Sequence, residues 1–513
     1  MDKKLVINMN SSETRIALLE GDRMAEIYIE RHSKKGLVGN IYKAKVARVL
    51  PGMQSAFINI GADRAAFLYG GDVLDPEFVK EEEERRRQEQ LSDQEQIPSD
   101  MRRHINRTPI EKLLRAGDEI CVQVAKEPLG SKGPRVTMLV TVPGRYLVLM
   151  PDISSVGISR RIQDEEKRQK LKEEVEAIKP PGMGLIVRTA AEHVPLDVLK
   201  ADMEYLISEW EQVEGKYHNS VVPSLLYQEP DLILKTTRDL YTDEVTEIVV
   251  DNPGAYSQIK HFLADTIPGA SDKLKLYTDQ NPVFDEFGVE IDISSSLSRR
   301  VWLPSGGYIV VDQTEALTSF DVNTGKFVGS QRVQDTILKI NLEAVTEVAA
   351  QLRKRNIGGI IVIDFIDMEN LKDRELLTKT LIEVLKKDKA KTNVLALNEL
   401  GLVQMTRKRT AESLERVLTV PCPHCEGTGR ISSIATSSYE LARDIERHYQ
   451  RTKCSSIAVK VREDILQNIE NEEAQLFRDL REKYDLDIQF SATQLNPKLL
   501  REPPYEIHTQ YDD

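Results

Sequence analysis

The sequence predicts an α/β protein, and more closely an α+β chain of several domains. Its 513 residues are more than one domain usually holds. Residues 39–68 alternate apolar and polar side chains around two turns, which is typical of an OB-fold barrel. Residues 307–367 have the pattern strand, turn, strand, helix, strand, which predicts neighbouring parallel strands. Together these observations place a barrel and an α/β sheet in one chain.

Two or three short strands are predicted at the N-terminus, over residues 4–8, 13–20 and 23–30. They are too few to make a domain alone. Residues 240–296 alternate strand-like and helix-like stretches, and we expect this later segment to complete the N-terminal sheet.

The predicted barrel begins with an alternating strand at 39–50 and continues through 55–61 and 64–68. It resumes at 117–124 after a charged interruption. Phe57 and Phe67 have two interpretations at this stage. They are barrel core, or they form a surface on which unpaired bases stack, an interaction worth ~1–3 kcal/mol per base. The spacing alone does not choose between them.

The insertion at 76–108 is almost entirely charged and lacks an apolar stripe, which predicts a solvated helix or a disordered segment. Residues 126–133 then form a glycine-punctuated loop with two lysines. Backbone N–H groups in such a loop can hold a phosphate, although the pattern alone is a weak signal.

A predicted strand at 185–190 ends in Arg188 and Thr189, between helices predicted at 165–178 and 198–216. A fork-shaped guanidinium beside a hydroxyl suits a terminal phosphate. The alternative, an ordinary surface arginine, is the more common situation for such a residue.

Acidic residues lie at the ends of two predicted strands that flank a long amphipathic helix at 331–355. Asp321 and Asn323 are two residues apart on the first strand and therefore project from one face. Asp364 ends the second strand, and Asp367 is expected to face away from it. Because α/β sheets carry chemistry at such strand ends, these side chains predict an active site.

A pair of aspartates on adjacent strands is costly unless a cation neutralises it. Oxygen ligands without His or Cys favour magnesium or manganese. Such a metal, held by Asp321 and Asp364, polarises a phosphoryl oxygen and generates a hydroxide nucleophile. Asn323 then orients Asp321 or the attacking water. The alternative is that these aspartates only cap helices and form turns.

Residues 422–429 form a C-x-x-C motif followed by glycines. A structural zinc takes about four ligands, and the chain's two further cysteines lie far away in sequence. The preferred interpretation is a zinc shared by Cys422 and Cys425 of two chains. A redox pair and a site completed by His424 remain alternatives, but redox motifs usually open a helix, whereas this motif follows a helix-like stretch at 409–418.

The composition favours a reducing, cytoplasmic location, since the chain has only 4 cysteines and no apolar run long enough for a membrane span. The first residues lack the apolar core of a signal peptide. The net charge of −13 does not exclude a locally basic RNA groove.

These segments together resemble the ribonuclease E/G family. The resemblance is carried by Phe57 to Phe67, Gly182 to Thr189, residues 314–323, Gly358 to Met368 and the C-x-x-C motif, in family order. It implies an endoribonuclease that cleaves A/U-rich single-stranded RNA, and the length after the motif favours the shorter branch of the family. The implied domains are an RNase H-like domain split between 1–37 and 233–296, an S1-type OB domain at 38–125, a 5′-sensor region at 126–232, a DNase I-like catalytic domain at 297–418, a zinc link at 419–430 and a small α/β oligomerisation domain at 431–513.

The resemblance also assigns roles to residues. It implies that Asp321 and Asp364 hold magnesium beside Asn323, and that Cys422 and Cys425 form a zinc link in a dimer of dimers. It implies that the aromatic pair Phe57 and Phe67 grips RNA. The pocket for a 5′-monophosphate would be formed by Gly130, Arg188, Thr189 and Lys391.

Two departures from the family stand out. Lys391 replaces an arginine and so loses the bidentate fork, and the insertion at 76–108 is longer and more charged. Two other classes of function compete with the enzyme. One is a non-catalytic RNA-binding scaffold built on the barrel, and the other is a zinc-knuckle cochaperone. Cochaperone modules carry several copies of the motif, whereas this chain has one, and the two acid-bearing strands favour an enzyme over a scaffold.

Overall fold

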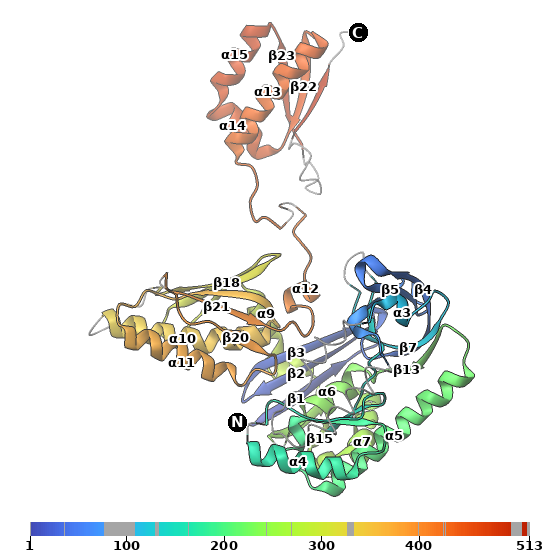
Figure 1. The fold of residues 1–513 in the computed structure, drawn as a ribbon. Coiled ribbons are helices and arrows are strands. Elements are labelled where there is room, and N and C mark those ends of the chain that lie inside the picture. Colours follow the sequence, from blue (N-terminus) through green and yellow to red (C-terminus); the bar gives the residue numbers. More distant parts are fainter. Residues whose placement is uncertain are drawn as a thin grey trace. The chain divides into compact units, whose positions relative to one another are not determined.

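The computed structural model of the chain divides into two compact units, Met1–Leu414 and Glu415–Asp513, each described by itself (Figure 1). The predicted insertion at 76–108, apart from its last residue, lies outside the described residues, as do Gly130 and His424. The structure describes residues 2–34, 36–75, 108–128, 133–162, 164–242, 244–267, 269–325, 333–398, 400–423, 425, 427–493 and 505–509.

The first sheet of the larger unit has five strands in the order β15-β14-β1-β2-β3. β1 pairs in parallel with β14, so the later segment completes the N-terminal sheet as expected. Helices α6 and α7 pack on it through a shared apolar core. The elements are β1 (Lys3–Met9), β2 (Glu13–Glu20), β3 (Arg23–Arg31), α6 (Leu232–Leu240), β14 (Val245–Val250), α7 (Pro253–Thr266), β15 (Leu274–Leu276), α8 (Val283–Glu286) and α9 (Val289–Leu297).

The predicted barrel is present as a closed ring of five strands in the order β4-β5-β6-β8-β7, closed by pairing of β7 with β4. Alternate residues such as Ala56, Ile58 and Leu68 point inward and are fully buried. β13 extends the sheet at β4. The elements are β4 (Ile41–Leu50), β5 (Ser55–Asn59), β6 (Ala66–Tyr69), α3 (Ile110–Leu113), β7 (Glu119–Lys126), β8 (Arg135–Thr137) and β13 (Ser224–Tyr227).

A four-stranded sheet in the order β11-β12-β10-β9 follows the barrel. The predicted helices on either side of β12 are both present, and α4 begins at a hydrogen bond from the Lys167 backbone to the Asp164 carboxylate. The elements are β9 (Val142–Pro143), β10 (Leu147–Met150), β11 (Val156–Ile158), α4 (Glu165–Ile178), β12 (Gly184–Val187) and α5 (Leu196–Asn219).

The acid-bearing strands belong to a six-stranded sheet in the order β16-β17-β18-β19-β21-β20. Helices α10 and α11 lie side by side and cover one face of this sheet (Figure 1). The apolar residues of the strands alternate toward these helices, which leaves the polar alternates on the open face. The elements are β16 (Arg300–Trp302), β17 (Tyr308–Gln313), β18 (Leu317–Asn323), α10 (Val333–Lys354), β19 (Gly359–Asp364), α11 (Leu371–Leu385), β20 (Thr392–Val394) and β21 (Leu402–Arg407).

The smaller unit holds a three-stranded sheet in the order β23-β22-β24, packed with three helices. The helix expected at 409–418 is shorter than predicted, because α12 begins only at Leu414. Before it, the Arg409 guanidinium donates to the Gly358 carbonyl and the Thr410 hydroxyl donates to Asn356, and these contacts hold the segment out of a helix. The elements are α12 (Leu414–Leu418), α13 (Ile434–Thr452), β22 (Ser456–Val461), α14 (Glu463–Asn471), α15 (Ala474–Tyr484), β23 (Asp487–Ala492) and β24 (Tyr505–Thr509).

None of the helices in the described part of the chain combines the length and the apolar character that a membrane crossing requires.

Candidate active site

The predicted carboxylates meet on the open face of the six-stranded sheet. β18 and β19 are parallel neighbours, and Asp321 is the register partner of Asp364. Partners on adjacent strands project from the same face. The Asn323 side-chain amide donates to an Asp321 carboxylate oxygen at 2.8 Å. The strand–helix–strand prediction is therefore correct, and it places all three side chains together.

The electrostatics of this pair suit a cation. Burial raises the pKa of the Asp364 carboxyl, and the negative charges of Asp321 and Asp367 raise it further. β19 ends at Asp364, so strand alternation does not extend to Asp367, and its charge acts on Asp364. A positive ion at this point would relieve the repulsion between the carboxylates.

Within the ranges given above, His, Cys, Asp and Glu side chains do not gather in a group of three or more that could hold a metal. A metal at the open face would therefore take two carboxylates from this chain and complete its shell with water or substrate oxygens, as magnesium commonly does.

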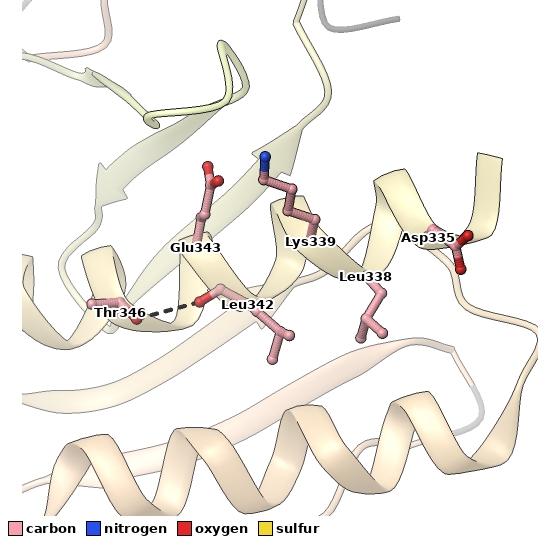
Figure 2. Close-up of a pocket in the computed structure, with 6 residues that line it drawn as sticks. All are labelled: Asp335, Leu338, Lys339, Leu342, Glu343 and Thr346. Carbon is pink, nitrogen blue, oxygen red and sulfur yellow. Dashed lines mark hydrogen bonds between the residues drawn. The ribbon is translucent and has the colours of Figure 1, made fainter. Parts of the chain in front are cut away.

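A hollow of about 430 Å³ lies along α10 and does not contain any of the predicted site residues. Figure 2 shows that Leu338 and Leu342 leave one side of the helix while Lys339 and Glu343 leave the other, so polar groups do not converge there. The six lining residues are Asp335, Leu338, Lys339, Leu342, Glu343 and Thr346. The active-site candidate is therefore the open sheet face, not this hollow.

Phe57 and Phe67 lie on the outside of the barrel. They are register partners on β5 and β6, and their rings meet edge to face with centroids 6.2 Å apart. The Phe57 side chain is 39% exposed, whereas its neighbours Ala56 and Ile58 are fully buried. Phe67 is half-buried. The core interpretation of these two rings is therefore wrong, and they form an aromatic pair on the outer surface of the barrel.

Arg188 and Thr189 follow β12, as the strand-end pattern predicts. The Arg188 guanidinium donates to the Gly144 carbonyl at 2.5 Å and to the Asp239 carboxylate at 2.7 Å. The Thr189 hydroxyl is 2.9 Å from that of Ser159. Arg188 is thus held in place by contacts within the protein, and Asp239 is a partner that the sequence did not reveal.

Asp239 is the centre of a charged group. Burial alone raises its pKa, but the charges of Arg238 and Arg188 outweigh that effect and hold the pKa below its ordinary value. Burial lowers the pKa of Lys389, and the negative charge of Glu26 and, more weakly, that of Asp239 oppose this effect. Lys391 is exposed, and its carbonyl accepts from the Lys408 backbone. Lys389 is thus a charged neighbour that the sequence did not reveal, and the role of Lys391 in a 5′-phosphate pocket stays a prediction.

The C-x-x-C motif lies in turns before α13, with Cys422 exposed and Cys425 half-buried. Hydrogen bonding from the Gly429 backbone lowers the pKa of the Cys425 thiol, aided by Gly427 and opposed by burial. The backbone at both glycines has positive φ, which lets the chain turn around the sulfur. A helix does not begin at either cysteine, since the next one starts at Ile434.

Comparison with known proteins gives the class of the molecule. The model of the Ribonuclease E/G family matches residues 141–410, and a model for the thioredoxin-like domain of these enzymes matches residues 421–509. The chain therefore belongs to the ribonuclease E/G family and is classed with it as an endoribonuclease.

Individual relatives place it further within the family. The chain is 42% identical to ribonuclease G of Haemophilus influenzae over 472 residues, 92% of each chain. It is 44% identical to ribonuclease G of Escherichia coli K12 over 448 residues, 87% of this chain and 88% of the relative. Ribonuclease E of E. coli K12 is 35% identical and is covered over only 40% of its length. The predicted similarity to the shorter branch, represented by ribonuclease G, is confirmed.

Proposed function

We propose that the protein is a magnesium-dependent endoribonuclease that cleaves A/U-rich single-stranded RNA and prefers 5′-monophosphorylated ends. Its cellular tasks would be mRNA decay and rRNA maturation in the cytoplasm. The observation that carries the proposal is the register pairing of Asp321 with Asp364 on the open sheet face of a ribonuclease E/G family member.

Asp321 and Asp364 would hold the magnesium ion, and their like charges side by side make the site suitable for a cation. When bound, magnesium polarises a phosphoryl oxygen and lowers the pKa of a water ligand. The chain's own contribution is positioning. The amide of Asn323 fixes the Asp321 carboxylate, and the two strands fix the separation of the acids.

The barrel would act as an S1-type OB domain that holds single-stranded RNA. Phe57, which is exposed, and Phe67, which is half-buried, pair on the outer surface of adjacent strands, and bases stack on such surfaces without sequence preference. The sheet of strands β1 to β3, β14 and β15 would be the RNase H-like domain, and the six-stranded sheet the DNase I-like catalytic domain.

Residues 126–232 would read the 5′ end of the RNA. Arg188 and Thr189 would contact a terminal phosphate, together with Gly130 and with Lys391 in place of an arginine. The Arg188 fork already contacts Asp239, so a phosphate would compete with that carboxylate for the guanidinium.

Cys422 and Cys425 would share one zinc ion with the same residues of a second chain. The pKa of the Cys425 thiol is lowered by backbone hydrogen bonds, which favours the thiolate that zinc binds. Two such dimers would associate, with the small α/β domain as an oligomerisation element.

The test is cleavage of a 5′-monophosphorylated, single-stranded A/U-rich oligonucleotide with and without magnesium. Asp321→Asn or Asp364→Asn should abolish cleavage while RNA binding and oligomeric state remain. Asp312→Asn is a matched control, because Asp312 is on the same face but pairs with Arg299. Full activity in either active-site variant would refute the mechanism. Binding without cleavage by the unaltered protein would favour the RNA-binding scaffold instead.

A further inference from the structure

An aromatic cluster lies on the edge strand β16 and the neighbouring strand β17 of the six-stranded sheet. The rings of Trp302 on β16 and Tyr308 on β17 meet edge to face, with centroids 5.3 Å apart. The Arg300 guanidinium lies over both rings, 4.4 Å from the Tyr308 centroid and 5.8 Å from that of Trp302. Three residues thus combine two π faces and one positive charge.

Strand register places this cluster on the same face as the acids. Trp302 pairs with Tyr308, and Tyr308 pairs with Asn323. In the next row, Arg300 pairs with Val310, which pairs with Asp321. Partners share a face, and neighbouring strands are about 4.8 Å apart, so Trp302 lies roughly 10 Å from the Asn323 strand. The cluster therefore adjoins the site of cleavage.

The exposure of Trp302 is unusual for this chain. The sequence has 2 tryptophans; Trp210 is buried in a core, whereas Trp302 is 61% exposed. Tryptophan carries a large apolar surface that is favourable to cover. A flat ring beside a guanidinium suits a nucleobase and its phosphate, because bases stack on aromatic faces and arginine binds phosphate.

We propose that Trp302, Tyr308 and Arg300 form a stacking subsite for a base of the RNA strand close to the cleaved bond. The occupant is a nucleotide of the substrate, argued from the shared face with Asp321 and Asn323. Trp302 and Tyr308 receive the base, and Arg300 contacts the adjoining phosphate. This inference rests on the proposed function of the same face and adds a positioning element to it.

The first test combines a change in the substrate with a change in the protein, as in a double-mutant cycle. A set of single-stranded oligonucleotides carries one abasic nucleotide at successive positions on either side of the cut. With the unaltered enzyme, kcat/KM should fall on the order of tenfold at one or two positions near the cut. On the intact oligonucleotide, kcat/KM of Trp302→Ala should be lower than that of the unaltered enzyme by the same factor. Abasic nucleotides at the sensitive positions should not lower kcat/KM of this variant further. Trp302→Phe should restore most of the lost kcat/KM.

Tyr205→Ala is the control, since Tyr205 is also exposed but lies on α5. Equal sensitivity of the unaltered enzyme and Trp302→Ala to every abasic position would overturn the inference while leaving cleavage itself established. A change of oligomeric state in Trp302→Ala, seen by light scattering with unchanged abasic sensitivity, would make the cluster a contact between chains and also overturn it. No cleavage by any protein would instead refute the proposed function.

A binding readout separates stacking from a structural role. In an Asp364→Asn, Trp210→Phe protein, Trp302 is the one remaining tryptophan. RNA should quench its fluorescence, and an oligonucleotide lacking the base at the sensitive position should quench it less. Identical quenching by both oligonucleotides would contradict the subsite.

Discussion

The Arg188 guanidinium contacts the Gly144 carbonyl oxygen and the Asp239 carboxylate within the protein. These contacts fix the orientation of the guanidinium. They also weaken its binding to a phosphate, because the phosphate must share the guanidinium with Asp239. A charged hydrogen bond is worth ~1.5–3 kcal/mol. Arg188 is thus pre-organised for phosphate binding, and Asp239 competes with the phosphate for it.

Arg188→Ala should lower the preference for a 5′-monophosphate over a 5′-hydroxyl on the order of tenfold. The cleavage rate of the 5′-hydroxyl substrate should stay the same, because the acids are untouched. Arg188→Lys should keep part of the preference, since lysine keeps the charge without the fork. The measurement is kcat/KM for two oligonucleotides that differ only at the 5′ end, and an unchanged ratio would locate 5′ sensing elsewhere.

Cys121 provides a second test at the scale of single residues. Burial raises the pKa of its thiol from 9.0 to about 12, aided by the charge of Asp152. At pH 8 the folded protein should therefore hold Cys121 unreactive toward a thiol reagent. Cys121→Ala should leave the native count of reactive thiols unchanged and lower the denatured count by one. Fast native labelling of Cys121 would contradict its burial.

The raised pKa of the Cys121 thiol also makes the stability of the folded protein depend on pH. Folding favours the neutral thiol, so its contribution is complete below about pH 9. That contribution is lost as the pH rises from 9 toward 12, where the unfolded chain ionises first.

At the scale of elements, one arginine connects α10 to the N-terminal sheet. Arg353 donates two hydrogen bonds to the Glu20 carboxylate, at 2.7 and 3.1 Å, and also binds Glu26 at 2.8 Å. Its side chain is only 11% exposed. Glu26 also accepts from the Tyr28 hydroxyl at 2.6 Å. This network joins the sheet that carries the acids to strands β2 and β3.

Arg353→Ala should destabilise the Met1–Leu414 unit by about 3 kcal/mol, because it leaves two carboxylates partly buried without their partner. Arg299→Ala is the matched control. It removes a similar pair, with Asp312, but the Arg299 side chain is 72% exposed and solvent screens the pair, so the loss of stability should be much smaller. Both tryptophans lie in this unit, so urea unfolding followed by tryptophan fluorescence reports on it. An equal loss of unfolding free energy in the two variants would show that burial does not strengthen the Arg353 network.

At the scale of the whole molecule, the chain carries one C-x-x-C pair in its smaller unit. In the part of the chain that the structure describes, a third or fourth metal-binding side chain does not join Cys422 and Cys425. A tetrahedral zinc site closed by two chains turns metal binding into association energy.

Cys422→Ser or Cys425→Ser should therefore lose zinc and halve the assembly, and the unaltered protein should hold one zinc for every two chains. Cys454→Ser, at a half-buried cysteine outside the motif, should change neither property. Metal analysis with light scattering decides the matter. One zinc per chain in a stable monomer would contradict a shared site.

The sequence by itself determined the features that depend on local periodicity. Strand alternation placed Asp321 beside Asn323, and a strand followed by a helix and a second strand predicted the parallel pairing with Asp364. The closed barrel and the completion of the N-terminal sheet followed from the same alternation and from the number of strands. These inferences hold because side-chain direction repeats every two residues on a strand.

Only the tertiary structure decided which side chains meet across long separations. It turned Phe57 and Phe67 outward as a pair, joined Arg188 to Asp239, and placed Lys389 beside Glu26. It also aligned Trp302 and Tyr308 with Asn323 through two strand registers. A one-dimensional pattern gives the face on which a residue lies. The partner on that face depends on how distant strands pair, and that follows from packing of the whole core.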